Sequence, residues 1–314
     1  MTNDILLGAI NIPAWVEGLK YIDLGILFVF LFFGVFVFLF RDFVPRIGAV
    51  AWVTAKESLF QPLFVVLVLV GLFALFIFLL IPYNTLGEDI KLVKTQGLTI
   101  VTLIAAFFGV WSASSTVTDE IDGKTALMTL AKPISRLDFI CGKYAGVMIA
   151  VTMVFLILGS FFLNTVSYKL VHDAREAAAD VPSSIECAAA VYNVLPALAL
   201  SYLQMIVLTA IAIAISTRLP ILPNLTITLT IYLVGNLIPE IVQSSVGQIA
   251  MVAFVADIAS AIVPSLGHFN SDTPIVMDQA LSWYYVGLSI IYAGLYCCLA
   301  LVVSLLLFED RDLA

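Results

Sequence analysis

The sequence predicts an all-α protein, a polytopic bundle of transmembrane helices with a six-span core and one additional span at the N-terminus. Hydrophobic residues make up 62% of the 314 residues and charged residues only 11%, whereas soluble domains carry about 25% charged residues. Apolar runs also recur along the whole chain, and each is about 20 residues long. That is the length a helix needs to cross a hydrocarbon core of about 30 Å.

Seven apolar runs meet this requirement. They cover residues 22–40, 61–82, 98–117, 144–165, 196–216, 221–239 and 283–307. None of the stretches between them would fold as a soluble domain, so we expect one integral membrane domain. The first twenty residues carry Asp4 and Glu17 where a signal peptide would carry basic residues, so the first span is expected to be retained.

The distribution of lysine and arginine predicts the orientation. With the N-terminus outside, nine basic residues face the cytoplasm: Arg41, Arg46, Lys56, Lys124, Lys132, Arg136, Lys143, Arg218 and Arg311. Five face outside: Lys20, Lys91, Lys94, Lys169 and Arg175. Because cytoplasmic loops are enriched in basic residues, we expect an outer N-terminus and a cytoplasmic C-terminus in the cell inner membrane. No basic patch with interleaved aromatics indicates nucleic-acid binding.

Residues 1–45 are expected to hold an outer segment and the additional span. The next residues, 46–60, predict a short amphipathic helix in the inner interface. Its large apolar residues recur at roughly helical spacing, at Trp52, Val53 and Phe60. The charged pair Lys56-Glu57 lies between them.

The segment Thr118–Gly146, TDEIDGKTALMTLAKPISRLDFICGKYAG, is a charged island between two predicted spans. We expect a new helix to begin here, with Asp119 and Glu120 in its first turn, where carboxylates complement the positive end of the helix dipole. Pro133 should stop this helix. Ser135, with Asp138 three residues on, predicts a capping box for the next helix. The result would be a rigid knuckle suited to docking a soluble partner.

The order of residues in this knuckle resembles the first cytoplasmic loop of type-2 ABC export permeases, over about residues 46–314. The resemblance implies that segment 118–142 couples to a separate ATP-binding subunit. The implied coupling residues are Asp119, Glu120, Gly123, Lys124, Thr125, Pro133, Ser135 and Arg136. Lys56 and Glu57 match the charged pair of the family's interfacial helix. It also implies pairing with a second permease chain, either an identical copy or a paralogue.

The Gly-Lys-Thr at 123–125 is not expected to bind ATP. A phosphate-binding loop needs a glycine five residues before the Gly-Lys pair and a preceding strand, but that position is Thr118 and a membrane helix precedes it. We therefore expect no catalytic site, cofactor or metal in this chain, with ATP and Mg²⁺ bound by the partner ATPase. No Cys/His spacing indicates a metal site.

The predicted spans hold no ionisable residue away from their ends. Ion-coupled carriers usually need one, so a carrier or a membrane enzyme is the least favoured hypothesis. An alternative from another class is a non-transport membrane component that transmits mechanical work to an outer-face partner. The strongest polar residues of the spans are expected to form interhelical hydrogen bonds. They are Asn164, Gln204 and Asn236.

Two longer outer loops complete the prediction. Residues 166–195 are expected to hold a short helix, with His172 in a surface role and Cys187 as a free thiol or a bridge between protomers. Residues 247–263 are apolar but short, and an interfacial, re-entrant or spanning arrangement stays open. The Pro-x-Leu-x-x-Phe-Asn at 264–270 is similar to the outer segment of the same permeases. Lipid, drug and polymer substrates fit these features equally.

Overall fold

The computed structural model describes residues 14–80, 89–122, 135–176, 180–244, 264–277 and 281–309, with isolated positions between them. The protein is an all-α, multi-pass membrane protein. Among the described residues, six helices are long and apolar enough to cross a membrane. They cover Pro62–Leu79, Ile90–Thr118, Arg136–Glu176, Ser184–Ser216, Ile221–Pro239 and Trp283–Phe308. The length and composition of these six helices confirm the predicted six-span core.

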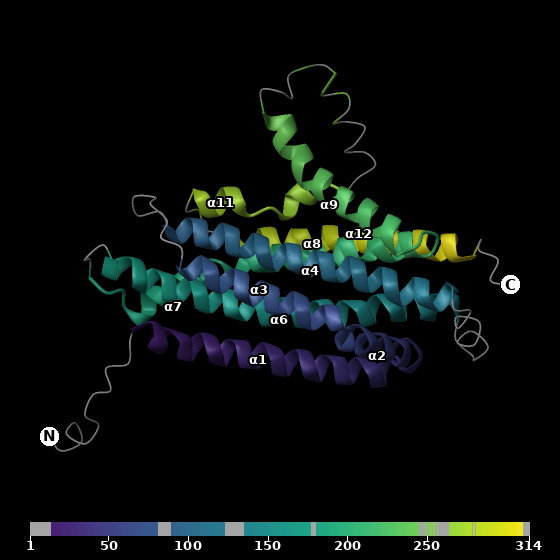
Figure 1. Cartoon of the computed structure of the whole chain (residues 1–314), viewed down its shortest axis with the longest axis horizontal. Helices are drawn as coiled ribbons and strands as arrows, with labels where there is room; N and C mark the ends of the chain where they lie inside the picture. Colours follow the sequence, from purple (N-terminus) through teal and green to yellow (C-terminus); the bar gives the residue numbers. More distant parts are fainter. Residues whose placement is uncertain are drawn as a thin grey trace.

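The predicted additional span at the N-terminus falls in helix α1 (Ala14–Phe43). Its described apolar stretch, Gly25–Leu39, is shorter than the other six, so a seventh span stays a prediction. Helix α1 lies along one side of the bundle, next to α6, and runs from α7 at one end to α2 at the other (Figure 1). We call these the α7 end and the α2 end. Many of its side chains are exposed, as expected for a helix facing lipid; they include Leu27, Phe28, Leu31 and Phe38.

The helix predicted at residues 46–60 is present as α2 (Pro45–Phe60), and its place in the inner interface stays a prediction. Proline at its first position costs no hydrogen bond. Its buried face consists mainly of small side chains, at Gly48, Val50, Ala51, Thr54, Ala55 and Ser58. The opposite face exposes Trp52, Val53 and Phe60. Small residues on the buried face allow α2 to approach its neighbour closely.

The next three helices are α3 (Pro62–Leu80), α4 (Asp89–Asp122) and α6 (Arg136–Glu176). Helices α4 and α6 are much longer than the predicted spans at 98–117 and 144–165. With 41 residues, α6 is about 62 Å long, twice the thickness of a hydrocarbon core. The predictions found the apolar middle of each helix and the capped start of α6, but they missed the polar extensions of α4 at both ends and of α6 at its far end.

The prediction that a new helix begins at Thr118 is wrong. Helix α4 continues through Asp119 and Glu120 to Asp122 without a break. The reason is local, because no glycine or proline occurs in α4 after Gly109, and Gly123 is the next one. The carboxylates therefore lie at the C-terminal end of a long helix rather than in the first turn of a new one.

The predicted outer loop at 166–195 is largely helical. Helix α6 continues to Glu176, and α7 (Ser184–Tyr192) follows, leading into α8 (Leu195–Ser216). A capping box begins α7, since the Glu186 amide donates to Ser183 Oγ (3.4 Å) and the Ser183 amide donates to Glu186 Oε2 (2.8 Å). Cys187 is a fully buried free thiol, which removes the alternative that it bridges two protomers.

The remaining elements are α9 (Ile221–Gln243), the short helices η2 (Leu266–Phe269) and α11 (Asp272–Val276), and α12 (Trp283–Glu309). The motif at 264–270 packs against α9, because a Cβ at Gly267 would lie 2.5 Å from Pro239 Cγ. Leu266 and Phe269 are buried. Most of the open segment 247–263 lies outside the described residues.

The core lies between α4, α6 and α8. In each of these helices 67% of the residues in the most apolar stretch are buried inside the protein, against 17–22% in α3, α9 and α12. The large core side chains include Phe108, Val154, Leu158, Phe162 and Met205. Three central helices are therefore surrounded by helices that face lipid, and this rigid centre positions the residues at both ends.

Candidate functional site

The start of α6 is fixed by the predicted capping box. The Asp138 amide donates to Ser135 Oγ at 3.1 Å, and the Ser135 amide donates to Asp138 Oδ2 at 3.1 Å. These bonds satisfy two donors at the start of α6. Ser135 and Arg136 are exposed at the α2 end of the bundle and are the first described residues after position 122. They belong to a helix whose first turn is capped.

Two glycines bring α6 into direct backbone contact with α2. A Cβ at Gly146 would lie 2.6 Å from the carbonyl oxygen of Ala51 and 2.6 Å from Thr54 Cβ. One at Gly142 would lie 2.6 Å from Val50 Cβ. Small residues four positions apart let membrane helices approach closely. Since any larger side chain would separate the helices, α2 and the first turns of α6 form one tightly packed unit.

A buried lysine strengthens this unit, and an aromatic stack joins it to a third helix. Lys143 is only 1% exposed, and its ammonium lies 3.8 Å from Glu57 Oε2 on α2. The same ammonium lies 5.9 Å from the ring centroid of Phe139, which stacks on Phe308 of α12 (centroids 5.6 Å, planes 17° apart). Glu57, predicted as part of a charged pair, thus contacts α6, while Lys56 lies over the Trp52 ring at 5.1 Å.

A buried network of side-chain hydroxyls and amides connects α2, α4, α8 and α9 near the α2 end. Ser112 donates to Ser58 Oγ (2.6 Å), and Gln61 donates to Ser115 Oγ (3.1 Å). The amide of Asn224 donates to Ser114 Oγ (2.8 Å) and to the Ala212 carbonyl (2.9 Å), and Thr228 donates to Asn224 Oδ1 (3.0 Å). Sequence reasoning missed this network. The signal was the run Ser112–Thr118, where five of seven residues carry hydroxyls.

The predicted coupling residues are only partly described. Asp119 and Glu120 belong to the last turn and a half of α4, and their side chains are not described. Gly123, Lys124, Thr125 and Pro133 lie outside the described residues. The ends of α4 and α6 that flank them lie together at the α2 end, beside α2 and the end of α12 (Figure 1). Asp119 and Glu120 lie at the C-terminal end of α4, where the negative end of the helix dipole repels carboxylates. The predicted stabilising role of these two residues is therefore wrong.

A cavity of about 230 Å³ that combines apolar and polar side chains lies toward the α7 end, between α4, α8, α9 and the 269–272 segment. Gln204 donates to Asn236 Oδ1 across α8 and α9 (2.9 Å), which confirms the interhelical role predicted for both. Asn164 instead donates to the Ser160 carbonyl of its own helix. The cavity is also lined by Thr102, Ser201 and Asp272.

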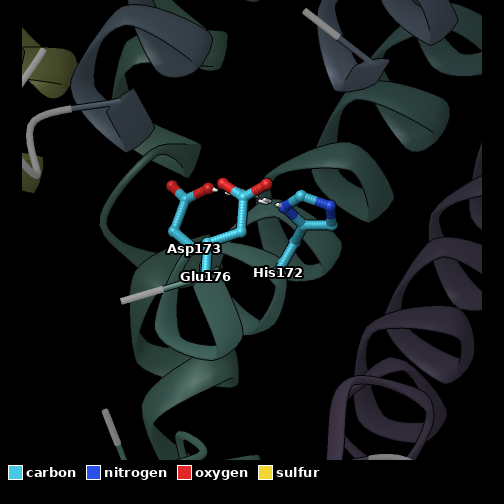
Figure 2. Close-up of side chains that lie close together, drawn as sticks. All are labelled: His172, Asp173 and Glu176. Carbon is cyan, nitrogen blue, oxygen red and sulfur yellow. Dashed lines mark ion pairs between the residues drawn. The ribbon is translucent and has the colours of Figure 1, made fainter. Parts of the chain in front are cut away.

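A charged cluster lies at the α7 end of α6 (Figure 2). Ligand-type atoms of His172, Asp173 and Glu176 lie within 4.8 Å of one another, and His172 Nδ1 is 3.9 Å from Asp173 and 3.7 Å from Glu176. The buried ammonium of Lys169 is 2.9 Å from Asp173 Oδ1. A metal ion bound here would be repelled by this ammonium. Lys169 and Asp173 form an ion pair, and the surface role predicted for His172 fits its 38% exposed side chain.

A scan against protein-family models and a search of curated proteins both found no match for this chain. The resemblance to type-2 ABC export permeases therefore stays a hypothesis, and its support comes from the residues and contacts described above.

Proposed function

We propose that this chain is the membrane-spanning permease subunit of an ATP-binding-cassette exporter. A separate ATPase subunit would bind ATP and Mg²⁺ and dock at the α2 end, on segment 118–142. The observation that carries this proposal is the link from the start of α6 into the bundle. Helix α6 begins with a capping box, and within eight residues of Ser135 it contacts both α2 and α12.

The arrangement supports a mechanical role for this end of the bundle. A force applied at Ser135 would act on a capped helix, which transmits displacement along its axis instead of fraying. The close contact of Gly142 and Gly146 with α2 and the Lys143–Glu57 ion pair would then move α2 together with α6. A solvated loop with no function would not require such contacts.

The charge distribution along α6 supports transport driven from outside the membrane. Residues 144–168 contain no Asp, Glu, Lys, Arg or His. The flanking lysines Lys143 and Lys169 are 26 positions apart, about 39 Å along the helix. A hydrocarbon core of about 30 Å fits between them, so no ionisable group has to lie inside it. This disfavours an ion-coupled carrier, which needs such a group.

We propose a pair of permease chains with two ATPase subunits, in the inner membrane with the α2 end cytoplasmic. Closed two-fold pairing is the commonest form of oligomer. The basic residues of the cytoplasmic loops support this orientation.

The test is co-purification of an ATP-binding subunit and its ATPase stimulation in the Glu120→Lys variant. At a docking interface, loss of a buried charge partner costs about 2–5 kcal/mol. Because Glu120 lies at the negative end of α4, the substitution should stabilise the helix slightly, by about 0.3–1 kcal/mol. We expect normal insertion with lost docking. The matched control Asp180→Lys, exposed at the α7 end, should dock normally. If Glu120→Lys docked the ATP-binding subunit as well as the wild type does, segment 118–142 would not be the coupling element.

A further inference from the structure

Helix α1 does not pack flush against the bundle along its length. Two cavities of about 410 and about 480 Å³ separate it from α6, α7 and α8. They share Val29 of α1 and Phe155, Leu156, Leu195 and Leu198 of the opposite wall, so they form one continuous space. We call this space the α1 crevice. Each part alone has the volume of a typical small-molecule site.

The α1 crevice is lined almost entirely by apolar side chains. On α1 they recur at helical spacing, at Gly25, Ile26, Val29, Phe33 and Phe36. The few hydroxyls in the lining are already hydrogen-bonded within the protein. Ser160 donates to the Leu156 carbonyl, and Thr152 and Tyr202 bond each other at 2.6 Å. An apolar space with no available polar group does not hold water.

The depth of the α1 crevice identifies what can fill it. Leu156, in the shared wall, is 13 residues from Lys143 and 13 residues from Lys169. It is therefore about 20 Å along α6 from each lysine, at the centre of the hydrocarbon layer that lies between them. At that depth the abundant apolar molecules are lipid acyl chains.

Two aromatic side chains mark the α7 end of the crevice. Trp283 Nε1 donates to the Tyr192 hydroxyl at 3.2 Å, and each residue lines one of the two cavities. Tryptophan and tyrosine prefer the level of lipid headgroups. A lipid in the crevice would thus place its headgroup beside this pair and its chain along Val29 and Leu156.

We propose that the α1 crevice binds one acyl chain of a membrane phospholipid from the leaflet at the α7 end, held between α1 and the bundle. This lipid is distinct from the surrounding annular lipid because protein walls enclose it on two sides. The inference does not rest on the exporter function, since it uses only the membrane position of these helices.

The test places the full-length protein in nanodiscs of phosphatidylcholine that contain a small fraction with a photoactivatable diazirine on the acyl chain. Crosslinked peptides are identified by mass spectrometry. The key variant is Gly25→Trp, because a Cβ at Gly25 meets no atom within 4 Å and the added ring can fill the crevice. The matched control is Gly34→Trp on the same helix. It has equal space, but nine residues further on it points to the opposite side of α1.

We expect labelling of α6 around Leu156 and of α8 around Leu198 in the wild type and in Gly34→Trp, with a severalfold loss in Gly25→Trp. Equal labelling of these peptides in both variants would overturn the proposal. Labelling confined to the exposed faces of the bundle would also overturn it, since that pattern indicates annular lipid only. Gly25→Leu adds a smaller side chain and should reduce labelling in the same direction, which keeps the test usable if the tryptophan variant is not inserted.

Discussion

The contact between α2 and α6 is tested by Gly146→Ala. The new Cβ would lie 2.6 Å from the Ala51 carbonyl oxygen and from Thr54 Cβ, far inside the optimal carbon contact of about 3.5–4.0 Å. The oxygen belongs to the backbone and cannot rotate away, so α2 has to move. Overpacking of this kind costs about 1–3 kcal/mol.

Replacing glycine by alanine also favours a helix intrinsically, by about 1 kcal/mol, and a control has to remove this term. Gly294→Ala on α12 serves this purpose, because a Cβ there meets no atom within 4 Å. The stability difference between the two variants then reports the clash alone. We expect Gly146→Ala to be less stable than Gly294→Ala by about 1–3 kcal/mol.

The measurement is the thermal midpoint of each purified variant in one detergent, together with stimulation of the ATP-binding subunit. A difference of 1 kcal/mol shifts Tm by roughly 2–4 °C in a domain of 150–250 residues, so Gly146→Ala should melt at least about 2 °C below Gly294→Ala. Under the proposed function its ATPase stimulation should fall as well. A Tm equal to or above that of Gly294→Ala would refute the close contact between α2 and α6.

Three further predictions concern other parts of the chain. Asn224→Ala should lower stability by about 1–2 kcal/mol, since it removes hydrogen bonds between membrane helices. The control is Thr226→Ala, two residues further along α9 and exposed, which should change Tm little. Ser135→Ala should cost about 0.5–2 kcal/mol through loss of the α6 cap, seen as faster amide exchange in the first turn of α6. A cysteine at Thr125, in a background without native cysteines, should be labelled by a membrane-impermeant reagent only in inverted vesicles. Labelling in intact cells would contradict the proposed orientation.

Local chemistry made part of the fold predictable. Seven apolar runs located the middles of α1, α3, α4, α6, α8, α9 and α12, because lipid requires a helix of roughly fixed length. The roughly helical spacing of Trp52, Val53 and Phe60 located α2. The Ser135–Asp138 capping box depends on residues three positions apart, and it forms as expected.

Helix extents were less predictable, because a membrane helix does not have to end at the surface of the hydrocarbon. Residues 169–176 of α6 are charged, yet the helix continues through them. The Lys169–Asp173 ion pair is four residues apart and stabilises that extension. In the same way α4 passes Thr118 into an acidic turn because no glycine or proline stops it. A reading based on hydropathy ends both helices too early.

Tertiary packing decided what the sequence left open. Asn224 reads as one polar residue in an apolar run, and only the meeting of α4, α8 and α9 shows that it bonds Ser114 and the Ala212 carbonyl. Lys143 reads as an interfacial lysine of the cytoplasmic loop, and only the approach of α2 shows that it is buried between Glu57 and Phe139. Apart from Phe139 and Thr228, the partners named for these two residues are at least 12 positions away in sequence.

These packed contacts set how a displacement would travel under the proposed function. Helix α6 is fixed to α2 through Gly142 and Gly146 and to α12 through the Phe139–Phe308 stack. A push at Ser135 therefore cannot move α6 alone, and α2 and α12 have to follow. Toward the α7 end α6 is a continuous helix as far as Glu176, so the same push reaches the Lys169–Asp173 pair about 50 Å away. Helix α1 meets α6 partly across the α1 crevice, and a fluid acyl chain there would let α6 move while α1 stays in place.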